Sequence, residues 1–398
     1  MPLRRSILVK SALSTLLLVL PMAPAAAQDV NAVAERLKAV LADQGAELSW
    51  TGISGDASEM VISGAAVAAK GGPDKITLGD ITLSDIAEEN GGYVVGEVAL
   101  PNYSVTEEGA TVTATGIEFT GLKLPAEGVT DPLAGLAMYH TADLESITVK
   151  LADKQVFSMD QLHFEISPPE DGKAMAFSGS AEKFSADLSV VQDPESRKVI
   201  DALGYSTIEG DYEMAGSWHP AEGTLEISQN DITVDNAGTF GVALAVEGYT
   251  ADFVKSLQDV QKKIAAQPEG ADNSAQGLAM LGLMQQLSFG WASVRFDDDS
   301  ITGKVLDYVA AQQGMKAADL ANQAKAILPF LMAKFNSPEL TAQVTAAVSA
   351  YLDDPVSLEI AAEPGAAVPF AVILAGAMSQ SPQDLVKTLA VTVTANED

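Results

Sequence analysis

Apolar and polar residues alternate with a period of two in much of the chain before residue 250, most clearly over residues 208–249. Turn-forming residues at 219–223 and 235–238 divide this stretch into three alternating runs. Such a pattern predicts an antiparallel meander with one buried face. We expect one set of side chains in the third run to be buried together, and the alternate set to face outward or toward a second layer. The buried set is Phe240, Val242, Leu244 and Val246, and the alternate set is Ala243, Ala245 and Glu247.

Two earlier alternating runs contain a glycine at or near the point where the apolar parity slips by one residue. They span residues 76–83, with Gly79, and residues 112–119, with Gly116. A β-bulge at each glycine would add one residue, bend the strand and restore the inward face beyond it, whereas a tight turn would give shorter strands. We favour bulges, and strands bent at intervals predict a strongly coiled sheet.

Helical periodicity of 3.6 residues occurs both before and after the strands. Residues 29–44 place Val33 and Leu37 on one apolar stripe, and residues 194–203 have the pattern of a second helix. After residue 250 the chain is mainly helical, with strands expected near 289–296, 356–360 and 389–393. The predicted fold class is α+β, with a long, bent, mainly antiparallel sheet followed by a helical region packed on it.

Residues 1–27 have the layout of a secretory signal peptide, with a basic start, an apolar run at 13–20 and three alanines before Gln28. The alternative, a membrane anchor, requires a longer apolar run. We expect cleavage before Gln28 and a periplasmic or secreted protein with no transmembrane span. The remaining chain divides into a β-rich domain with a leading helix at 28–250 and a mainly helical region with a few strands at 251–398.

The net charge is −31, from 54 acidic and 23 basic residues, and it falls to −34 when the predicted signal peptide is removed. So acidic a chain repels phosphate backbones, which excludes nucleic acid as a partner. The absence of cysteine excludes thiolate catalysis, zinc–thiolate sites and disulfides. Serine-hydrolase elbows, phosphate-binding glycine loops and paired-histidine helix motifs are also missing from the sequence. We therefore assign no catalytic, cofactor-binding or metal-binding residue.

The three histidines offer only weak candidates for chemistry. His163 and Glu165 lie two apart on one strand, a spacing that could supply two metal ligands, but neither His140 nor His219 has a spacing that completes a site. Ser217 lies two residues before His219, where a strand meets a turn and the two side chains seldom face each other. We interpret the histidines as residues of half-buried strands and turns.

The densest acidic cluster is Asp297, Asp298 and Asp299, directly before a predicted helix that starts near Ser300. A calcium loop would alternate its ligands and contain a glycine turn. An aspartate at a helix start satisfies free N–H groups and the helix dipole. We favour helix capping over calcium binding, with Arg295 close enough to pair with the cluster.

Residues 366–378 contain no charged residue and are rich in Val, Ile, Leu and Phe. The run is too short for a membrane span. It predicts a buried helix or strand pair, and the alternative is an apolar surface that lines a cavity for a lipophilic ligand.

The signal peptide, the short leading helix and strands such as Ile76-Thr77-Leu78-Gly79-Asp80-Ile81-Thr82-Leu83 resemble two groups of proteins. One group is the uncharacterised secreted proteins of Gram-negative bacteria, known only as domains of unknown function. The other is the AsmA-like envelope proteins, whose long coiled sheets form apolar grooves for lipids. The resemblance covers roughly residues 28–250. The chain differs from the AsmA-like proteins in lacking an evident membrane anchor, and no functional residue is carried over.

These observations predict a non-catalytic envelope protein that binds or scaffolds an apolar ligand or an envelope partner. An apolar-ligand binder requires a continuous groove lined by inward positions such as Phe240, Val242 and Leu244. A purely structural or interaction protein requires those positions to be fully packed. A hydrolase requires a cleft in which His163 or His219 meets a carboxylate or hydroxyl.

Overall fold

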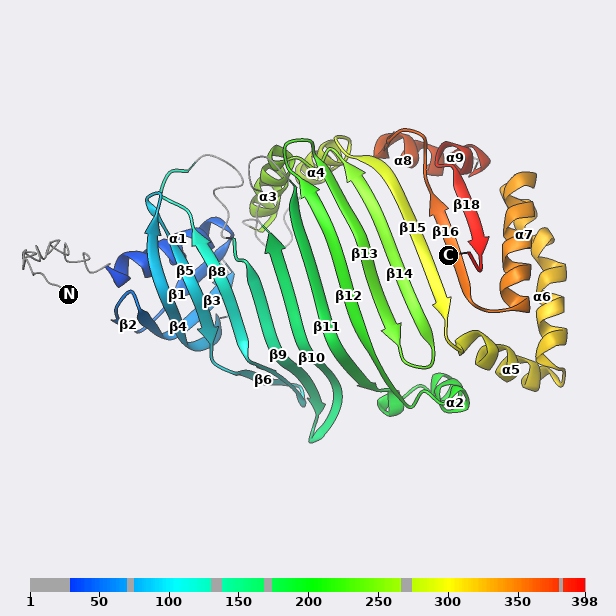
Figure 1. Ribbon diagram of the computed structural model, residues 1–398, viewed down its shortest axis with the longest axis horizontal. Coiled ribbons are helices and arrows are strands. Elements are labelled where there is room, and N and C mark those ends of the chain that lie inside the picture. The colour runs from blue at the N-terminus through cyan, green and yellow to red at the C-terminus, as the bar shows by residue number, and fades with distance from the viewer. Residues whose placement is uncertain are drawn as a thin grey trace, which may run out of the picture.

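The computed structural model describes residues 29–69, 75–129, 138–167, 174–265, 274–378 and 382–397. Within these residues, eighteen strands form one antiparallel sheet, and nine α-helices lie around it (Figure 1). The predicted fold class is confirmed, with most of the helices in the C-terminal half. The predicted signal peptide lies outside the described residues.

The N-terminal end of the sheet is covered by a helix and contains the main hydrophobic core. Helix α1 (Val30–Asp43) begins at Asp29, whose carboxylate accepts a hydrogen bond from the backbone N–H of Asn31. Its stripe of Val33, Ala34 and Leu37 is buried against strand residues that include Met60, Ile62 and Leu83. The strands beneath it are β1 (Ala46–Ser49), β2 (Gly52–Gly55), β3 (Glu59–Ala69), β4 (Lys75–Glu89) and β5 (Gly92–Leu100).

Two long interrupted strands lead from this end into the centre of the sheet. Strands β5 and β6 (Tyr103–Glu107) continue each other across Pro101, and β8 (Ile117–Leu124) and β7 (Ala110–Thr115) pair alongside them. Strand β9 (Thr141–Leu151) pairs with both β8 and β7. The path of the sheet therefore continues through the break at Gly116.

The centre of the sheet is an antiparallel meander in which each strand pairs with the next. Its members are β10 (Lys154–Ser167), β11 (Met175–Asp187), β12 (Thr207–His219), β13 (Thr224–Val234) and β14 (Gly238–Glu247). The three strands predicted for residues 208–249 are confirmed. The short helices η1 (Leu188–Val190) and α2 (Pro194–Leu203) connect β11 to β12, and α2 has the predicted bounds.

The helical part after residue 250 returns four strands to the same sheet. Strand β15 (Ser288–Asp298) pairs with β14, with β16 (Ser357–Ala362) and with the short β17 (Val368–Pro369), and β18 (Val391–Ala395) pairs with β16. The intervening helices are α3 (Ala251–Ala265), α4 (Ser274–Met284), α5 (Ile301–Gln313), α6 (Ala317–Met332), η2 (Ala333–Phe335), α7 (Pro338–Asp353), α8 (Phe370–Met378) and α9 (Pro382–Thr388).

The predicted bulge occurs at Gly79, whereas the bulge expected at Gly116 is absent, because Thr115 pairs with Ser146 and Glu118 with Asp143 and no residue is added. Gly79 lies within the continuous strand β4 with a φ of 88°, next to a register shift against β3, and Gly116 separates β7 from β8 with a φ of 60°. Beyond each glycine the apolar residues change parity and return to the same face. At Gly116 the change is matched across the sheet, since β9 and β10 make the same change of parity opposite it, where Gln161 has a φ of 52°. At this break the neighbouring strands therefore change parity together and keep their register.

Directly paired residues of an antiparallel sheet have side chains on the same face, so the registers define two faces. One row across nine strands is apolar apart from a tyrosine hydroxyl, and we call this side the apolar face. Its members are Leu144, Leu162, Ala181, Tyr212, Ile232, Phe240, Phe296, Leu358 and Ala395. The adjacent row lies on the opposite, polar face and consists of Asp143, His163, Ser180, Glu213, Asp231, Gly241, Arg295, Glu359 and Thr394.

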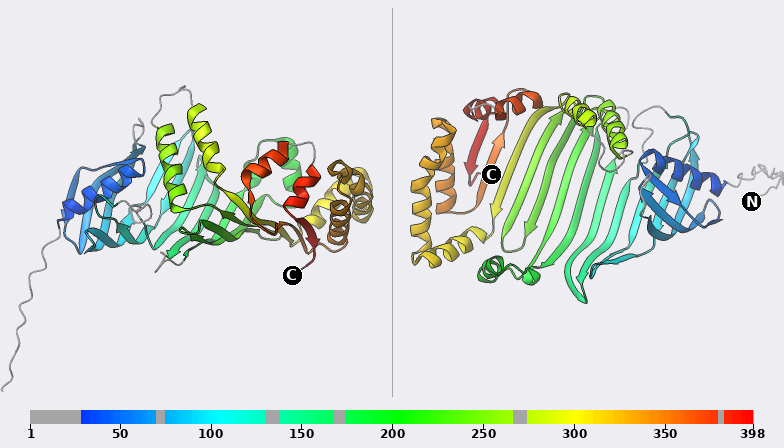
Figure 2. Two further views of the ribbon diagram at one scale, coloured as in Figure 1. Left: turned by 90° about the horizontal axis from the view of Figure 1, so that it is seen from above. Right: turned by 180° about the vertical axis from the view of Figure 1, so that it is seen from behind.

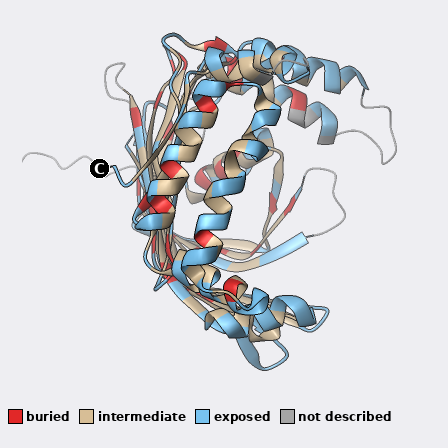
Figure 3. Ribbon diagram, turned by 90° about the vertical axis from the view of Figure 1, so that its right-hand side faces the viewer, coloured by how far each residue is buried: buried red, intermediate tan, exposed pale blue. Residues whose placement is uncertain are grey.

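The helices border the sheet instead of covering it. Helix α1 lies over the N-terminal end, α3, α4, α8 and α9 lie along one long edge, α2 and α5 lie along the other, and α6 and α7 stand at the C-terminal end (Figure 1). Seen from above and from behind, α1, α3 and α4 lie on the same side of the sheet (Figure 2). The view along the sheet shows its curvature (Figure 3), and neither β15 nor β18 contains a buried residue.

Candidate functional site

The apolar face is open in the C-terminal half of the sheet. Phe240 is 48% exposed, Ile232 44%, Val294 39% and Ile360 50%, although all four alternate with polar-face residues in regular strands. At the N-terminal end the equivalent positions Met60, Ile62 and Leu83 are fully buried beneath α1. The same strand pattern is thus covered at one end of the sheet and uncovered at the other.

The prediction that Phe240, Val242, Leu244 and Val246 are buried together is therefore wrong in part. The four share the apolar face, but Phe240 is exposed and the other three are half-buried. Val246 packs beside Phe253 and Leu283 of the core between α3 and α4, whereas Phe240 belongs to neither hydrophobic core of the described residues. Among the predicted outward residues, Glu247 is exposed, Ala243 is half-buried and Ala245 is buried beside its cross-strand partner Trp291.

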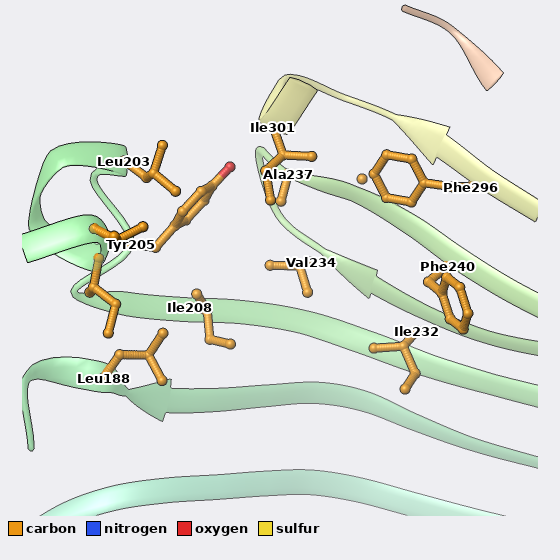
Figure 4. Close-up of a pocket in the computed structure, with 13 residues that line it drawn as sticks. Leu188, Leu203, Tyr205, Ile208, Ile232, Val234, Ala237, Phe240, Phe296 and Ile301 are labelled. Carbon is orange, nitrogen blue, oxygen red and sulfur yellow. The ribbon is translucent and has the colours of Figure 1, made fainter. Parts of the chain in front are cut away.

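The open face deepens into a pocket of about 380 Å³ beside the helices α2 and α5 (Figure 4). Helix α2 closes one side of the pocket, and the first turn of α5 closes another. The wall is apolar except for the hydroxyl of Tyr205. Its residues are Leu188, Val199, Ile200, Leu203, Tyr205, Ile208, Ile232, Val234, Ala237, Gly238, Phe240, Phe296 and Ile301.

A cluster of hydrogen-bond donors borders this pocket at Tyr205. The hydroxyl of Tyr205 donates to the carbonyl oxygen of Asn236 at 2.7 Å. The Nζ of Lys304 donates to the Tyr205 oxygen at 3.0 Å and to the Asn236 carbonyl at 2.9 Å, and it lies 4.4 Å from the centre of the Tyr205 ring. Lys304 is one turn along α5 from Ile301, which lines the pocket. A fixed positive charge therefore lies next to an apolar cavity.

Sequence reasoning missed Tyr205, Asn236 and Lys304. The signal that could have pointed to Lys304 is that it is the only basic residue of α5, three positions after Ile301 and so on the same helix face. Its proximity to Tyr205 depends on how α5 packs on the turn between β13 and β14, which no local pattern specifies.

His163 and Glu165 contact different partners and are not brought together as ligands of one site. His163 Nδ1 lies 2.7 Å from Asp143 Oδ1, whereas Glu165 Oε1 lies 3.7 Å from Nε2 of His140. Among the residues that the structure describes, no group of three or more His, Asp or Glu side chains is arranged to hold a metal ion.

Asp143, His163 and Ser180 are neighbours across three adjacent strands, an order that invites comparison with a catalytic triad. They lie on the polar face, where the His163 side chain is 45% exposed. In the described part of the chain no hydrogen bond joins His163 to Ser180, or Ser217 to His219. The carboxylate contact that a hydrolase requires is present at His163, but the pocket and the open apolar face are on the other side of the sheet.

One member of the acidic triplet caps the start of helix α5. Asp298 Oδ1 accepts a hydrogen bond from the backbone N–H of Thr302 at 2.9 Å, as helix capping predicts. Asp297 forms the expected ion pair with Arg295, with 2.8 Å between the carboxylate and the guanidinium, and this contact raises the pKa of Arg295. Asp299 is exposed.

The uncharged run at 366–378 forms β17 and α8 and is not buried as predicted. Phe370 packs beside Phe253 and Leu283 of the small core between α3 and α4, but Val372, Leu374 and Met378 are 48%, 49% and 88% exposed. The helix lies at the edge of the sheet beside α9 (Figure 1). None of the described helices is long and apolar enough to cross a membrane.

Comparison with known proteins finds a similarity in the C-terminal part of the chain. A family model described as an uncharacterised protein matches residues 231–396, from within β13 to just past β18. No curated protein matches the chain. The matched region contains the open end of the apolar face, the α5 helix and Lys304.

Proposed function

We propose that this protein binds the hydrocarbon chain of a lipid-like ligand on the open apolar face, without catalysing a reaction. The observation that carries the proposal is the exposure of Phe240, Ile232, Val294 and Ile360 on one continuous face of a regular sheet. Contiguous exposed apolar surface of this kind is rare on soluble monomers and marks sites for ligands, proteins or membranes.

The energetic argument rests on the contrast between the two ends of the sheet. Removing apolar surface from water contributes about 25 cal/mol per Å². At the N-terminal end, α1 supplies that contribution by covering Met60, Ile62 and Leu83. Around Phe240 no helix of the described chain covers the sheet, and the apolar surface stays in water. A flexible hydrocarbon ligand lying across the strands would remove this surface from water and gain the corresponding free energy on binding. The polar face, with its carboxylates and hydroxyls, remains in water.

A purely structural role is less well supported, because it requires the inward positions to be packed. A hydrolase is also less well supported, because His163 meets its carboxylate on the polar face, away from the pocket. The likeness of the strand pattern to AsmA-like envelope proteins, with their apolar grooves, agrees with lipid binding and remains part of the proposal.

We also propose that the protein is exported to the periplasm or beyond, with cleavage of residues 1–27. The basic start, the short apolar run and the three alanines before Gln28 support this location. Intact-mass measurement on protein recovered from the producing cell should give a chain that starts at or near Gln28. Recovery of the full chain from Met1 in the cytosol would contradict export.

The ligand proposal is tested by adding one charge to each face of the same strand. Val242 and Ala243 are consecutive residues of β14 on opposite faces and are both half-buried. We expect Val242→Glu to weaken binding of dodecan-1-ol, measured by calorimetry or native mass spectrometry, by about tenfold or more, because the ligand would desolvate a carboxylate. Ala243→Glu should stay within about twofold of the parent. Failure of the parent to bind dodecan-1-ol, or equal effects of the two changes, would contradict the proposal.

A further inference from the structure

Two carbonyl groups at the rim of the pocket receive more hydrogen-bond donors than they have lone pairs. The carbonyl of Asn236 is approached by the hydroxyls of Tyr205 and Ser300 and by the Nζ of Lys304. The carbonyl of Ala237 is approached by the backbone N–H groups of residues 299, 300 and 301 at 3.0 to 3.2 Å. A carbonyl oxygen has two lone pairs, so these six donors share about four acceptor sites.

The donors belong to groups that favour an anion. Residues 299–301 are the start of α5, where the helix dipole is positive, and Lys304 adds a full charge one turn later. Within the described chain Lys304 forms no ion pair with a carboxylate. The nearby carboxylate of Asp298 is committed to the N–H of Thr302 and the hydroxyl of Tyr351. The rim therefore has a surplus of donors and an unneutralised positive charge.

The pocket beside this rim fits a single hydrocarbon chain. Its volume of about 380 Å³ lies near the lower end of the range of ~300–1,000 Å³ that is typical of small-molecule sites. Ile232, Phe240 and Phe296 belong both to the pocket wall and to the open apolar face. A chain that enters the pocket can therefore continue along the sheet while its head group stays at the rim.

We infer that the pocket binds a fatty-acid carboxylate, with the alkyl chain against Ile232, Phe240 and Phe296 and the carboxylate at Lys304 and Tyr205. This inference rests on the proposed function and specifies its ligand class. The carboxylate oxygens accept hydrogen bonds from Lys304 Nζ and the Tyr205 hydroxyl, which relieves the crowding at the Asn236 carbonyl. Charge-assisted hydrogen bonds of this type are stronger than those between neutral groups.

The experiment compares two probes of equal chain length, dodecanoate and dodecan-1-ol, on the purified protein at pH 7.5 by isothermal titration calorimetry. Lys304→Met removes the charge and keeps an unbranched side chain, and Lys304→Arg restores the charge. Lys198→Met is the control, because Lys198 is an exposed residue of α2 next to Val199, which lines the pocket. We expect Lys304→Met to weaken dodecanoate binding by about tenfold or more and to leave dodecan-1-ol binding within about twofold of the parent.

Lys304→Arg should recover most of the dodecanoate affinity, and Lys198→Met should keep all of it. Equal dodecanoate affinity in the parent and in Lys304→Met would overturn the inference and leave apolar binding intact. Parallel loss of both probes in Lys304→Met would also overturn it, because the role assigned to Lys304 is specific to the head group. If the parent bound neither probe, the proposed function itself would fall.

Discussion

At the scale of single residues, the direction of a side chain and its burial have different causes. Alternation places Phe240 and Leu83 on the same face of the sheet, and the sequence predicts that much correctly. Whether another layer lies over that face depends on where helices from distant parts of the chain pack. Leu83 is covered by α1, whereas Phe240 is half exposed. Burial of Phe240 was predicted wrongly because periodicity carries no information about coverage.

This difference predicts unequal costs for equal truncations of inward-facing aliphatic residues. Leu83→Ala should lower the free energy of unfolding by about 2–5 kcal/mol, because it leaves a cavity in a closed core. Ile360→Ala should lower it by about 1 kcal/mol, because Ile360 is 50% exposed and its removal creates no cavity. Urea denaturation monitored by tryptophan fluorescence measures both values. Equal costs would show that Ile360 is covered as completely as Leu83.

A second prediction at this scale concerns Asp187, where β11 ends. A hydrogen bond from Lys154 Nζ, supported by those from Ser189, lowers the pKa of Asp187 to about 2. An aspartate has a pKa of about 3.9 in the unfolded chain. The ionised carboxylate therefore stabilises the folded state at pH values above about 4, and this contribution is lost as the pH falls toward 2.

The stability difference between the parent and Asp187→Asn should accordingly be full at pH 6 and should shrink between about pH 4 and pH 2. Urea midpoints at pH 6, 4, 3 and 2.5 give the comparison. Lys154→Met removes the hydrogen bond that lowers the pKa of Asp187 most, so its stability difference from the parent should also shrink between about pH 4 and pH 2. A difference that stays constant over this range would contradict the assignment.

At the scale of elements, most of the fold was predictable because the chain marks its strands and turns locally. The meander at 208–249, the helix at 194–203 and the bulge at Gly79 all follow from period, turn residues and parity. The bulge expected at Gly116 is absent, because parity alone does not distinguish an added residue from a change of backbone conformation shared by adjacent strands. The burial of residues 366–378 was not predictable, because an uncharged apolar run of that length fits a buried element as well as an exposed one. The structure places it as the exposed helix α8 at the edge of the sheet.

The break between β7 and β8 at Gly116 predicts a selective cost for adding a side chain. Gly116 has a φ of 60°, and a Cβ atom there would lie 2.6 Å from Cβ of Glu145. Gly109 has a φ of 84° with nothing within 4 Å of the added atom. Gly109→Ala should therefore cost about 1–2 kcal/mol for its backbone conformation alone. Gly116→Ala should cost at least ~1 kcal/mol more, because it adds the steric clash.

Chemical denaturation of the two glycine variants tests this bend of the sheet. A smaller effect at Gly116 than at Gly109 would mean that Glu145 does not lie opposite it in the neighbouring strand.

At the scale of the whole molecule, the protein is a curved sheet whose apolar face is covered at one end and open at the other. Helices lie along both long edges of the sheet, and the pocket beside Lys304 lies at the edge formed by α2 and α5. The candidate site was only partly predictable, since an apolar face can be inferred from alternation, but its openness and its charged rim arise from packing. The chain is strongly acidic, which makes the positive charge of Lys304 beside the pocket more informative.

The most direct measurement of the central claim uses the absence of cysteine from the chain. Single cysteines at Val294 and Ser293, consecutive residues of β15 on opposite faces, can each be labelled with a bimane fluorophore. We then measure quenching of each label by a fatty acid brominated on its alkyl chain. The account predicts strong, saturable quenching of the label in Val294→Cys and little quenching of the label in Ser293→Cys. Equal quenching of the two labels, or quenching only at Ser293→Cys, would contradict binding on the apolar face.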